Sequence, residues 1–196
     1  LIATFKQRYP SISLEFKEMV SKEQIEALNQ NSISFGLIRP PVDPVKMNII
    51  SIQVEPILVA IPKSHHLADL TSIPVNKLHG AAFIGFDPDS AAYFSRLSEN
   101  FFTTHKIKPL IVQTATQLYT LTALVAAGLG IALVPESASR IHLEGFVLRP
   151  LALDSPPQAE LCLAWNKNDR NPAISSFLKL LEENGANLDS ISDLIT

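Results

Sequence analysis

Two glycines two residues apart, Gly128 and Gly130, form the stretch that most resembles a nucleotide-binding loop. A loop that cradles phosphate lies between a strand and the N-terminus of the next helix, so that backbone amides face the phosphate. Here the order is reversed, because a helical pattern (116–127) precedes the glycines and a strand pattern (131–134) follows them. We therefore expect Gly128 to end the helix, and Gly130 to let the chain turn closely into the strand.

The other residues that could do chemistry do not form a catalytic or metal-binding constellation. His65 and His66 lie in a polar segment without a third ligand nearby in sequence, which favours a solvated turn over a metal site. Cys162 is the only cysteine and alternates with apolar residues, as a buried core thiol in a strand would. Asp87 and Asp89 flank a proline and look like helix-capping residues. The sequence thus predicts no enzyme, no metal and no cofactor.

Two polar residues at helix starts are more informative. Ser21 and Thr116 each follow a predicted strand and are expected to cap the next helix. In parallel α/β units such caps lie at the carboxyl ends of strands, where ligands bind. Amides and hydroxyls there would suit a carboxylate or another small anion. The alternative, that both residues are simply caps, stays open at this point.

The composition is that of an ordinary globular protein. Hydrophobic residues make up 46% of the 196 residues, and the net charge is -3. No basic stripe is present, so we do not expect these residues to grip DNA themselves. No apolar run reaches the roughly 20 residues that span a bilayer. The chain opens on Leu1, without a signal-peptide pattern, and looks like part of a longer protein.

The hydrophobic pattern predicts alternating strands and helices along the chain. The expected strands are 12–16, 33–38, 49–54, 56–62, 81–86, 110–113, 131–134, 146–151 and 161–165. Helices are expected at 1–8, after Ser21, after Ser90, at 116–127, at 136–141 and from Pro172 to Asn184-Gly185. The tail from 186 to 196 is read either as a short packed helix or as frayed. The first strand, helix and second strand are expected to form a β-α-β unit with parallel strands.

This alternation favours an α/β fold with two lobes. The chain leaves the first lobe near Val54, builds a second one, and returns before Leu161. The predicted boundaries are 1–54 with 160–196 for lobe I, and 55–159 for lobe II. Two Rossmann-like lobes joined by two crossover strands would leave a cleft, and ligands favour such clefts.

Several stretches together resemble the effector-binding domain of LysR-type transcriptional regulators. The stretches are Thr4-Phe5 to Tyr9-Pro10, Glu18 to Leu28, Val59-Ala60-Ile61-Pro62 with His66-Leu67-Ala68, and Leu124 to Pro135. The resemblance implies the type-2 periplasmic-binding-protein fold. It also implies a cytoplasmic, ligand-sensing regulator, whose N-terminal helix-turn-helix domain and first effector-domain strand are absent from this chain.

The resemblance also implies site residues. Ser21 matches a Ser/Thr that contacts the effector, and Arg39 a basic position in members that sense aromatic or dicarboxylic acids. Phe94 matches an aromatic position near the ligand, and Thr116 and Gln117 match a polar cap on the second lobe. A small, anionic organic acid is the effector that these positions imply.

The implied partners are a small-molecule effector, a second copy of the chain, and DNA through the absent N-terminal domain. Family members associate as dimers or tetramers through their effector domains, and the residues expected to contribute are Leu1, Phe5, Leu121, Leu124 and Leu129. The equally weighted alternative is that each of them belongs to the core of its own chain. The alternatives are a transporter's periplasmic solute-binding protein, which has the same fold, and an enzyme with its site in the cleft.

Overall fold

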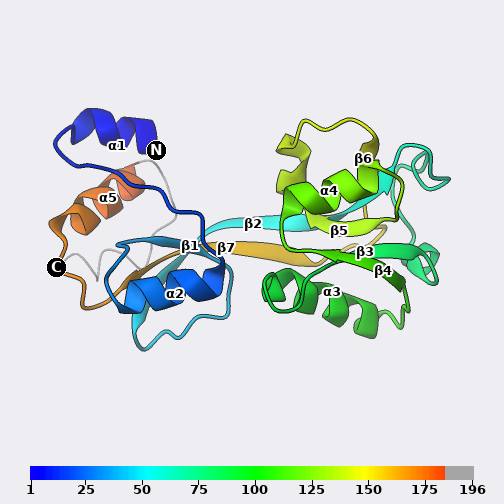
Figure 1. The fold of residues 1–196 in the computed structure, drawn as a ribbon, viewed down its shortest axis with the longest axis horizontal. Coiled ribbons are helices and arrows are strands. Elements are labelled where there is room, and N and C mark those ends of the chain that lie inside the picture. The colour runs from blue at the N-terminus through cyan, green and yellow to red at the C-terminus, as the bar shows by residue number, and fades with distance from the viewer. Residues whose placement is uncertain (184–196) are drawn as a thin grey trace. The chain divides into compact units, whose positions relative to one another are not determined.

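The computed structural model describes residues 1–183 of the 196-residue chain. The chain divides into two compact units (Figure 1). Unit 1 contains residues 1–53 and the chain from residue 160 onward, and unit 2 contains residues 54–159. The chain passes between the units twice, within strands β2 (Met47–Pro62) and β7 (Gln158–Asn166). Unit 2 is therefore continuous in sequence, whereas unit 1 is built from both ends of the described chain.

Unit 1 has a small sheet with one helix on each face. Strand β1 (Gly36–Ile38) pairs antiparallel with β7, and β7 is bonded to β2. One apolar cluster joins Leu28 of α2 (Ser21–Asn29) to Ile38 and Cys162. A second cluster joins Trp165 to α5 (Pro172–Glu183). Because neighbouring side chains on a strand point to opposite faces, β7 supplies residues to both clusters.

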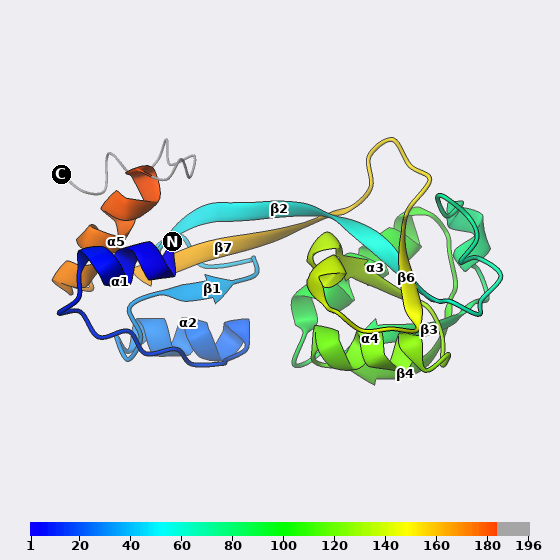
Figure 2. The same ribbon diagram turned by 90° about the horizontal axis from the view of Figure 1, so that it is seen from above.

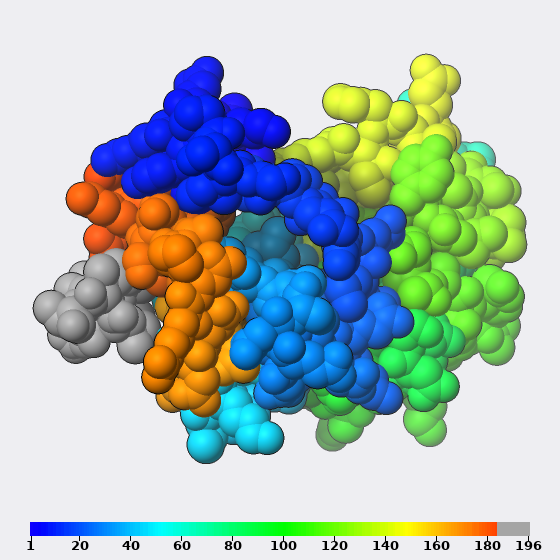
Figure 3. All heavy atoms as spheres, turned by 60° about the vertical axis from the view of Figure 1, so that its left-hand side comes forward, coloured from blue at the N-terminus to red at the C-terminus, as the bar shows by residue number. Residues whose placement is uncertain are grey.

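Helix α1 (Ile2–Arg8) lies against α5 in unit 1 (Figures 2 and 3). The side chain of Phe5 is only 1% exposed. Its ring centroid is 5.2 Å from that of Phe177, in an edge-to-face contact, and 4.9 Å from that of Tyr9. Arg8 also forms an ion pair with Glu183. Aromatic packing, which is worth more than its buried area alone, thus holds α1 in place.

Unit 2 is a three-layer α/β/α arrangement. Its strands β3 (Ala82–Phe86) and β4 (Leu110–Ala115) are parallel. A parallel bridge from Phe83 to Ile131 joins β3 to the start of β5 (Ala132–Pro135). Strands β5 and β6 (Phe146–Pro150) both pair antiparallel with β2. Helix α3 (Ala92–Thr104) packs on one face of this sheet, and α4 (Leu118–Ala126) packs on the other.

Two 3-10 helices complete unit 2, η1 (Val75–Leu78) and η2 (Glu136–Arg140). The two glycines after α4 connect a helix to a strand, as predicted. Gly128 has a φ of +86°, the left-handed conformation that ends helices. A Cβ atom on Gly130 would lie 2.7 Å from the carbonyl oxygen of Ala82, so a side chain would collide with β3. The glycines therefore bring the chain from α4 into the sheet.

Most predicted elements form, but the predictions for the first strands were wrong. Residues 12–16 form no strand, and no described strand pairs with them, although Ile12 and Leu14 are half-buried. The predicted parallel β-α-β unit is therefore not observed, and β1 is antiparallel to its neighbour β7. The predicted strands 49–54 and 56–62 are one continuous strand, β2, because Glu55 and Pro56 extend it without a break.

The prediction for α5 was correct at its N-terminus, where Asn171 accepts a hydrogen bond from the backbone N–H of Ala173 at 3.0 Å. Its predicted end at Asn184-Gly185 and the tail 186–196 lie outside the described residues.

Candidate functional site

The structure brings two of the predicted site residues together in unit 1. The hydroxyl of Ser21 accepts a hydrogen bond from the backbone N–H of Arg39 at 3.1 Å. This contact joins the start of α2 to the carboxyl end of β1. Ser21 is not the helix cap, however, because the N-cap is Val20, whose N–H is bonded to the carboxylate of Glu23 at 3.1 Å. The hydroxyl is therefore used in a tertiary contact.

Cys162 of β7 lies close to this pair. Cys162 is paired with Ile38, the residue before Arg39, and its side chain is buried. Burial and the carboxylate of Glu160, which also accepts a hydrogen bond from the thiol, raise the pKa of Cys162 to about 11, while the charge of Arg39 acts to lower it. The thiol is therefore protonated at neutral pH, which fits the predicted core role. Sequence reasoning missed Glu160, which acts on Cys162 from two residues away along β7.

In unit 2, Thr116 and Gln117 lie between β4 and α4. The N-cap of α4 is Gln117, so the prediction that Thr116 caps this helix was wrong. The N-cap makes no side-chain hydrogen bond to the first turn, so backbone amides of α4 lack a side-chain cap. The N–H of Asp87 donates to the carbonyl of Ala115 at 3.0 Å. The carboxyl ends of β3 and β4 thus lie side by side, with these polar residues at that edge.

Phe94, the fifth predicted residue, is packed into unit 2. Its ring is stacked on Phe86 with centroids 4.8 Å apart, and it meets Tyr93 edge-to-face at 5.2 Å. It contacts both apolar clusters of the unit and is half-buried. Most of this ring is therefore committed to packing, and only its remaining exposed part could meet a ligand.

Two carboxylates at the same edge of unit 2 were not predicted as site residues. Asp87 accepts hydrogen bonds from the N–H and the hydroxyl of Ser90, both at 2.8 Å, and these bonds hold the pKa of Asp87 below its usual value. Glu55 is only 3% exposed, and its carboxylate accepts the N–H of Ser137 at 2.6 Å. The one feature of the sequence that could have drawn attention to Glu55 is its position as a charged residue just before an apolar strand.

These groups can bind but show no means of catalysis. Hydroxyls, backbone amides and a guanidinium can hold a polar or anionic ligand by hydrogen bonds and charge. The protonated, buried thiol of Cys162 is a poor nucleophile. Residues 1–183 contain no group of three or more His, Cys, Asp or Glu side chains that could hold a metal ion. His65 lies in a turn, where its ring accepts the N–H of Leu67 at 3.2 Å.

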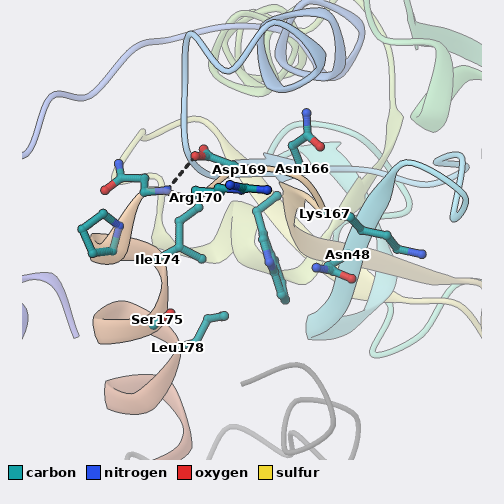
Figure 4. Close-up of a pocket in the computed structure, with 11 residues that line it drawn as sticks. Asn48, Asn166, Lys167, Asp169, Arg170, Ile174, Ser175 and Leu178 are labelled. Atoms are coloured by element: carbon teal, nitrogen blue, oxygen red, sulfur yellow. Dashed lines mark hydrogen bonds between the residues drawn. The ribbon is translucent and has the colours of Figure 1, made fainter. Parts of the chain in front are cut away.

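A small pocket of about 170 Å³ lies elsewhere in unit 1, between the end of β7 and the start of α5 (Figure 4). None of the five predicted site residues lines it. Its polar groups stabilise the local turn, since Asp169 accepts the N–H of Asn171 at 2.9 Å and Lys167 donates to the carbonyl of Pro44 at 2.7 Å. Asn166 likewise donates to the carbonyl of Leu28 at 3.1 Å. We therefore assign the pocket no ligand.

Comparison with known structures identifies the fold. The effector-binding domain of a BenM variant is 26% identical, with a TM-score of 0.81, over 93% of this chain and 85% of that one. The regulatory domain of CcmR from Synechocystis PCC6803, in complex with 2-PG, is 19% identical and has a TM-score of 0.80, over 95% and 90% of the two chains. The predicted two-lobe α/β fold of the periplasmic-binding-protein type is confirmed.

Curated relatives are regulators. The Hca operon transcriptional activator HcaR of Escherichia coli K12 is 28% identical over 93% of this chain and 62% of its own length. The regulator AlsR of Bacillus subtilis 168 is 27% identical over 92% of this chain and 59% of its own. The chain thus spans about three-fifths of the length of these relatives, which are transcriptional regulators and not enzymes, as predicted. Within residues 1–183, no helix is long and apolar enough to cross a membrane.

The family described as the LysR substrate binding domain matches residues 1–186. This match, together with the regulators among the relatives, favours the predicted regulator over a transporter's solute-binding protein. The chain belongs to the LysR substrate binding domain family.

Proposed function

We propose that the chain is the ligand-sensing domain of a cytoplasmic transcriptional regulator whose effector is a small organic acid. The observation that carries the proposal is the contact between the Ser21 hydroxyl and the backbone of Arg39, which sets a hydroxyl beside a cationic residue at the end of β1. A carboxylate suits this pair, because arginine and hydroxyl donors form strong, charge-assisted hydrogen bonds with it.

Unit 2 carries polar residues of its own that the proposal includes as ligand contacts. The edge that carries Thr116 and Gln117 also holds the N-terminus of α4, whose N-cap makes no side-chain hydrogen bond to the first turn. Helix N-termini favour negative groups. The exposed part of Phe94 would contact an apolar portion of the effector. BenM has been solved with its effector benzoate, and CcmR with 2-PG, so both compounds are suitable first probes for this chain.

The proposed signal passes from the effector to DNA through parts outside this chain. An effector shifts the balance between two arrangements of a protein only by binding one of them more tightly. A helix-turn-helix domain and a dimer or tetramer of the full-length protein would convert that shift into changed transcription. Leu1 and Leu129, each 46% exposed, remain candidates for self-association. Phe5 and Leu121 are core residues of their own units and are withdrawn as contact residues.

The test is calorimetric titration of the chain with benzoate and with 2-PG. Binding of one molecule per chain is expected for an effector. Ser21→Ala and Thr116→Val should each weaken binding by about 1 kcal/mol, the contribution of one hydrogen bond. Ser51→Ala and Thr104→Val make the same chemical changes at exposed positions and should leave affinity unchanged.

Because Ser21→Ala also removes the bond to Arg39, Ser21→Thr serves as a second variant that keeps a hydroxyl and should retain binding. Unchanged affinity in both Ser21→Ala and Thr116→Val would remove these residues from the site.

A further inference from the structure

One face of α2 carries Ser21, Gln24 and Leu28. These residues are three and four positions apart, the spacing that places side chains next to each other on a helix. A Cβ atom on Gly36, the first residue of β1, would lie 3.0 Å from Oε1 of Gln24 and 3.1 Å from Cδ1 of Leu28. Gly36 therefore lets α2 come close to the strand, and the side chain of Gln24 lies against the backbone there.

Gln24 also holds the segment that leads into α2. Its side-chain Nε2 donates a hydrogen bond to the carbonyl of Met19 at 2.8 Å, and its backbone N–H donates to the carbonyl of Val20 at 3.0 Å. One residue thus binds the two carbonyls directly before Ser21. The backbone bond belongs to any α-helix, whereas the bond to Met19 requires a side chain that can donate.

These contacts bear on the bond between Ser21 and Arg39. The hydroxyl of Ser21 meets the backbone N–H of Arg39 at 3.1 Å, directly after the last residue of β1. That distance depends on where the first turn of α2 lies relative to β1. Gln24 touches the first residue of this strand and fixes the peptide groups that precede Ser21. Its side chain therefore acts on both elements that the Ser21–Arg39 bond joins.

We propose that Gln24 is a positioning residue of the effector site, which holds the Ser21 hydroxyl at the backbone of Arg39 and so sets the affinity for a carboxylate. This inference rests on the proposed function, since Ser21 and Arg39 are residues that the proposal assigns to the effector. A glutamine that only stabilised the helix would affect unfolding and leave the bond between Ser21 and Arg39 intact. The two roles therefore differ in a measurable way.

The first test needs no ligand. Gln24→Ala removes the bond to Met19 and the contact with Gly36 but keeps a residue that favours helix. The backbone N–H of Arg39, followed by hydrogen exchange in NMR, should then exchange severalfold faster, because its acceptor on Ser21 is no longer held in place. Gln30→Ala makes the same substitution at the exposed residue after α2 and should leave this rate unchanged. An unchanged rate in Gln24→Ala would overturn the proposal.

The second test is calorimetric titration with benzoate and with 2-PG. Gln24→Ala should weaken the binding of an effector roughly twofold to tenfold, the factor that one hydrogen bond corresponds to. Asn166→Ala serves as the structural control, because Asn166 donates to the carbonyl of Leu28 at 3.1 Å and to Oδ1 of Asn31 at 2.9 Å, at the other end of α2. It should lower the stability of unit 1, read from Trp165 fluorescence in urea, and leave the affinity unchanged.

Equal losses of affinity in Gln24→Ala and Asn166→Ala would show that α2 acts only through its stability, and would overturn the proposal. Faster exchange at Arg39 without a loss of affinity for a probe that binds would overturn it as well. If neither benzoate nor 2-PG binds to the wild type while the exchange is faster in Gln24→Ala, the positioning of Ser21 by Gln24 is supported. The carboxylate effector of the proposed function is then contradicted instead.

Discussion

Units 1 and 2 present their polar residues by different means. In unit 2, β3 and β4 are parallel, so the segments that follow them meet at one edge of the sheet through topology alone. In unit 1, β1 is antiparallel to its neighbour β7, and the backbone N–H of Arg39, directly after β1, donates a hydrogen bond to the Ser21 hydroxyl. The polar edge of unit 2 is therefore set by strand topology, whereas the backbone position of Arg39 in unit 1 depends on one side-chain contact.

The largest expected effect concerns unit 1 alone. Phe5→Ala should lower the free energy of unfolding by about 3–4 kcal/mol, the usual cost of removing a buried phenylalanine ring. Trp165, the only tryptophan, lies in unit 1, so its fluorescence during urea unfolding reports this unit. Phe16→Ala makes the same change at a side chain that is 72% exposed and should cost less than 0.5 kcal/mol. Equal costs for the two variants would contradict the packing of α1.

The corresponding change in unit 2 is Gly130→Ala. Its Cβ would lie 2.7 Å from the backbone oxygen of Ala82, which cannot move aside easily, so a loss of roughly 2–3 kcal/mol is expected. Gly85→Ala is the matched control, because its nearest neighbour would be 3.8 Å away. Far-UV circular dichroism should show the loss. If the units unfold separately, Gly130→Ala will leave the midpoint of the Trp165 fluorescence transition unchanged. If they unfold as one, the fluorescence and circular dichroism midpoints will shift together.

The smallest effect tests the loop that follows β3, at the edge of the sheet in unit 2. Hydrogen bonds from Ser90 hold the pKa of Asp87 below its usual value, so the ionised form stabilises the fold. This contribution is present above the ordinary aspartate pKa, and it is lost as the pH falls through the lower folded value. Asp87→Asn should therefore be less stable than the wild type at pH 7 and equally stable near pH 2. Asp89→Asn, in the same loop, should show less pH dependence in thermal unfolding.

The sequence predicted the elements of unit 2 well and those of early unit 1 less well. The order from β3 to α4 follows from strong periodic patterns and local turn residues. The segment 12–16 has the alternating pattern of a strand. A strand also needs a partner strand for its backbone hydrogen bonds, and the pattern does not show whether a partner is available. Pro56 was read as the start of a new strand, yet β2 runs through it. In these two segments, the pairing of strands thus decided the structure against the local sequence pattern.

The predicted site residues were chosen from their position along the chain and from the family resemblance, and their role in binding stays a prediction. Ser21 and Thr116 were proposed because helices begin near them, and Gln117 was proposed from the family resemblance. The roles of Ser21 and Thr116 as caps were wrong, since Val20 and Gln117 hold those positions. The carboxylates of Glu55 and Glu160 were missed for a physical reason. The partner of Glu55 is brought close only by folding, since Ser137 is 82 residues away along the chain. Glu160 acts on Cys162, two residues along the same strand, and the strand pattern gave no sign of that contact.

The division of the chain also fixes the order in which its parts leave the ribosome. Unit 2 is complete once residue 159 has been made, when β7 is barely begun and α5 does not yet exist. Domains generally fold as units during synthesis. The nascent chain can therefore fold unit 2 before unit 1 is complete. Helix α5 must then pack against α1, which was synthesised long before it.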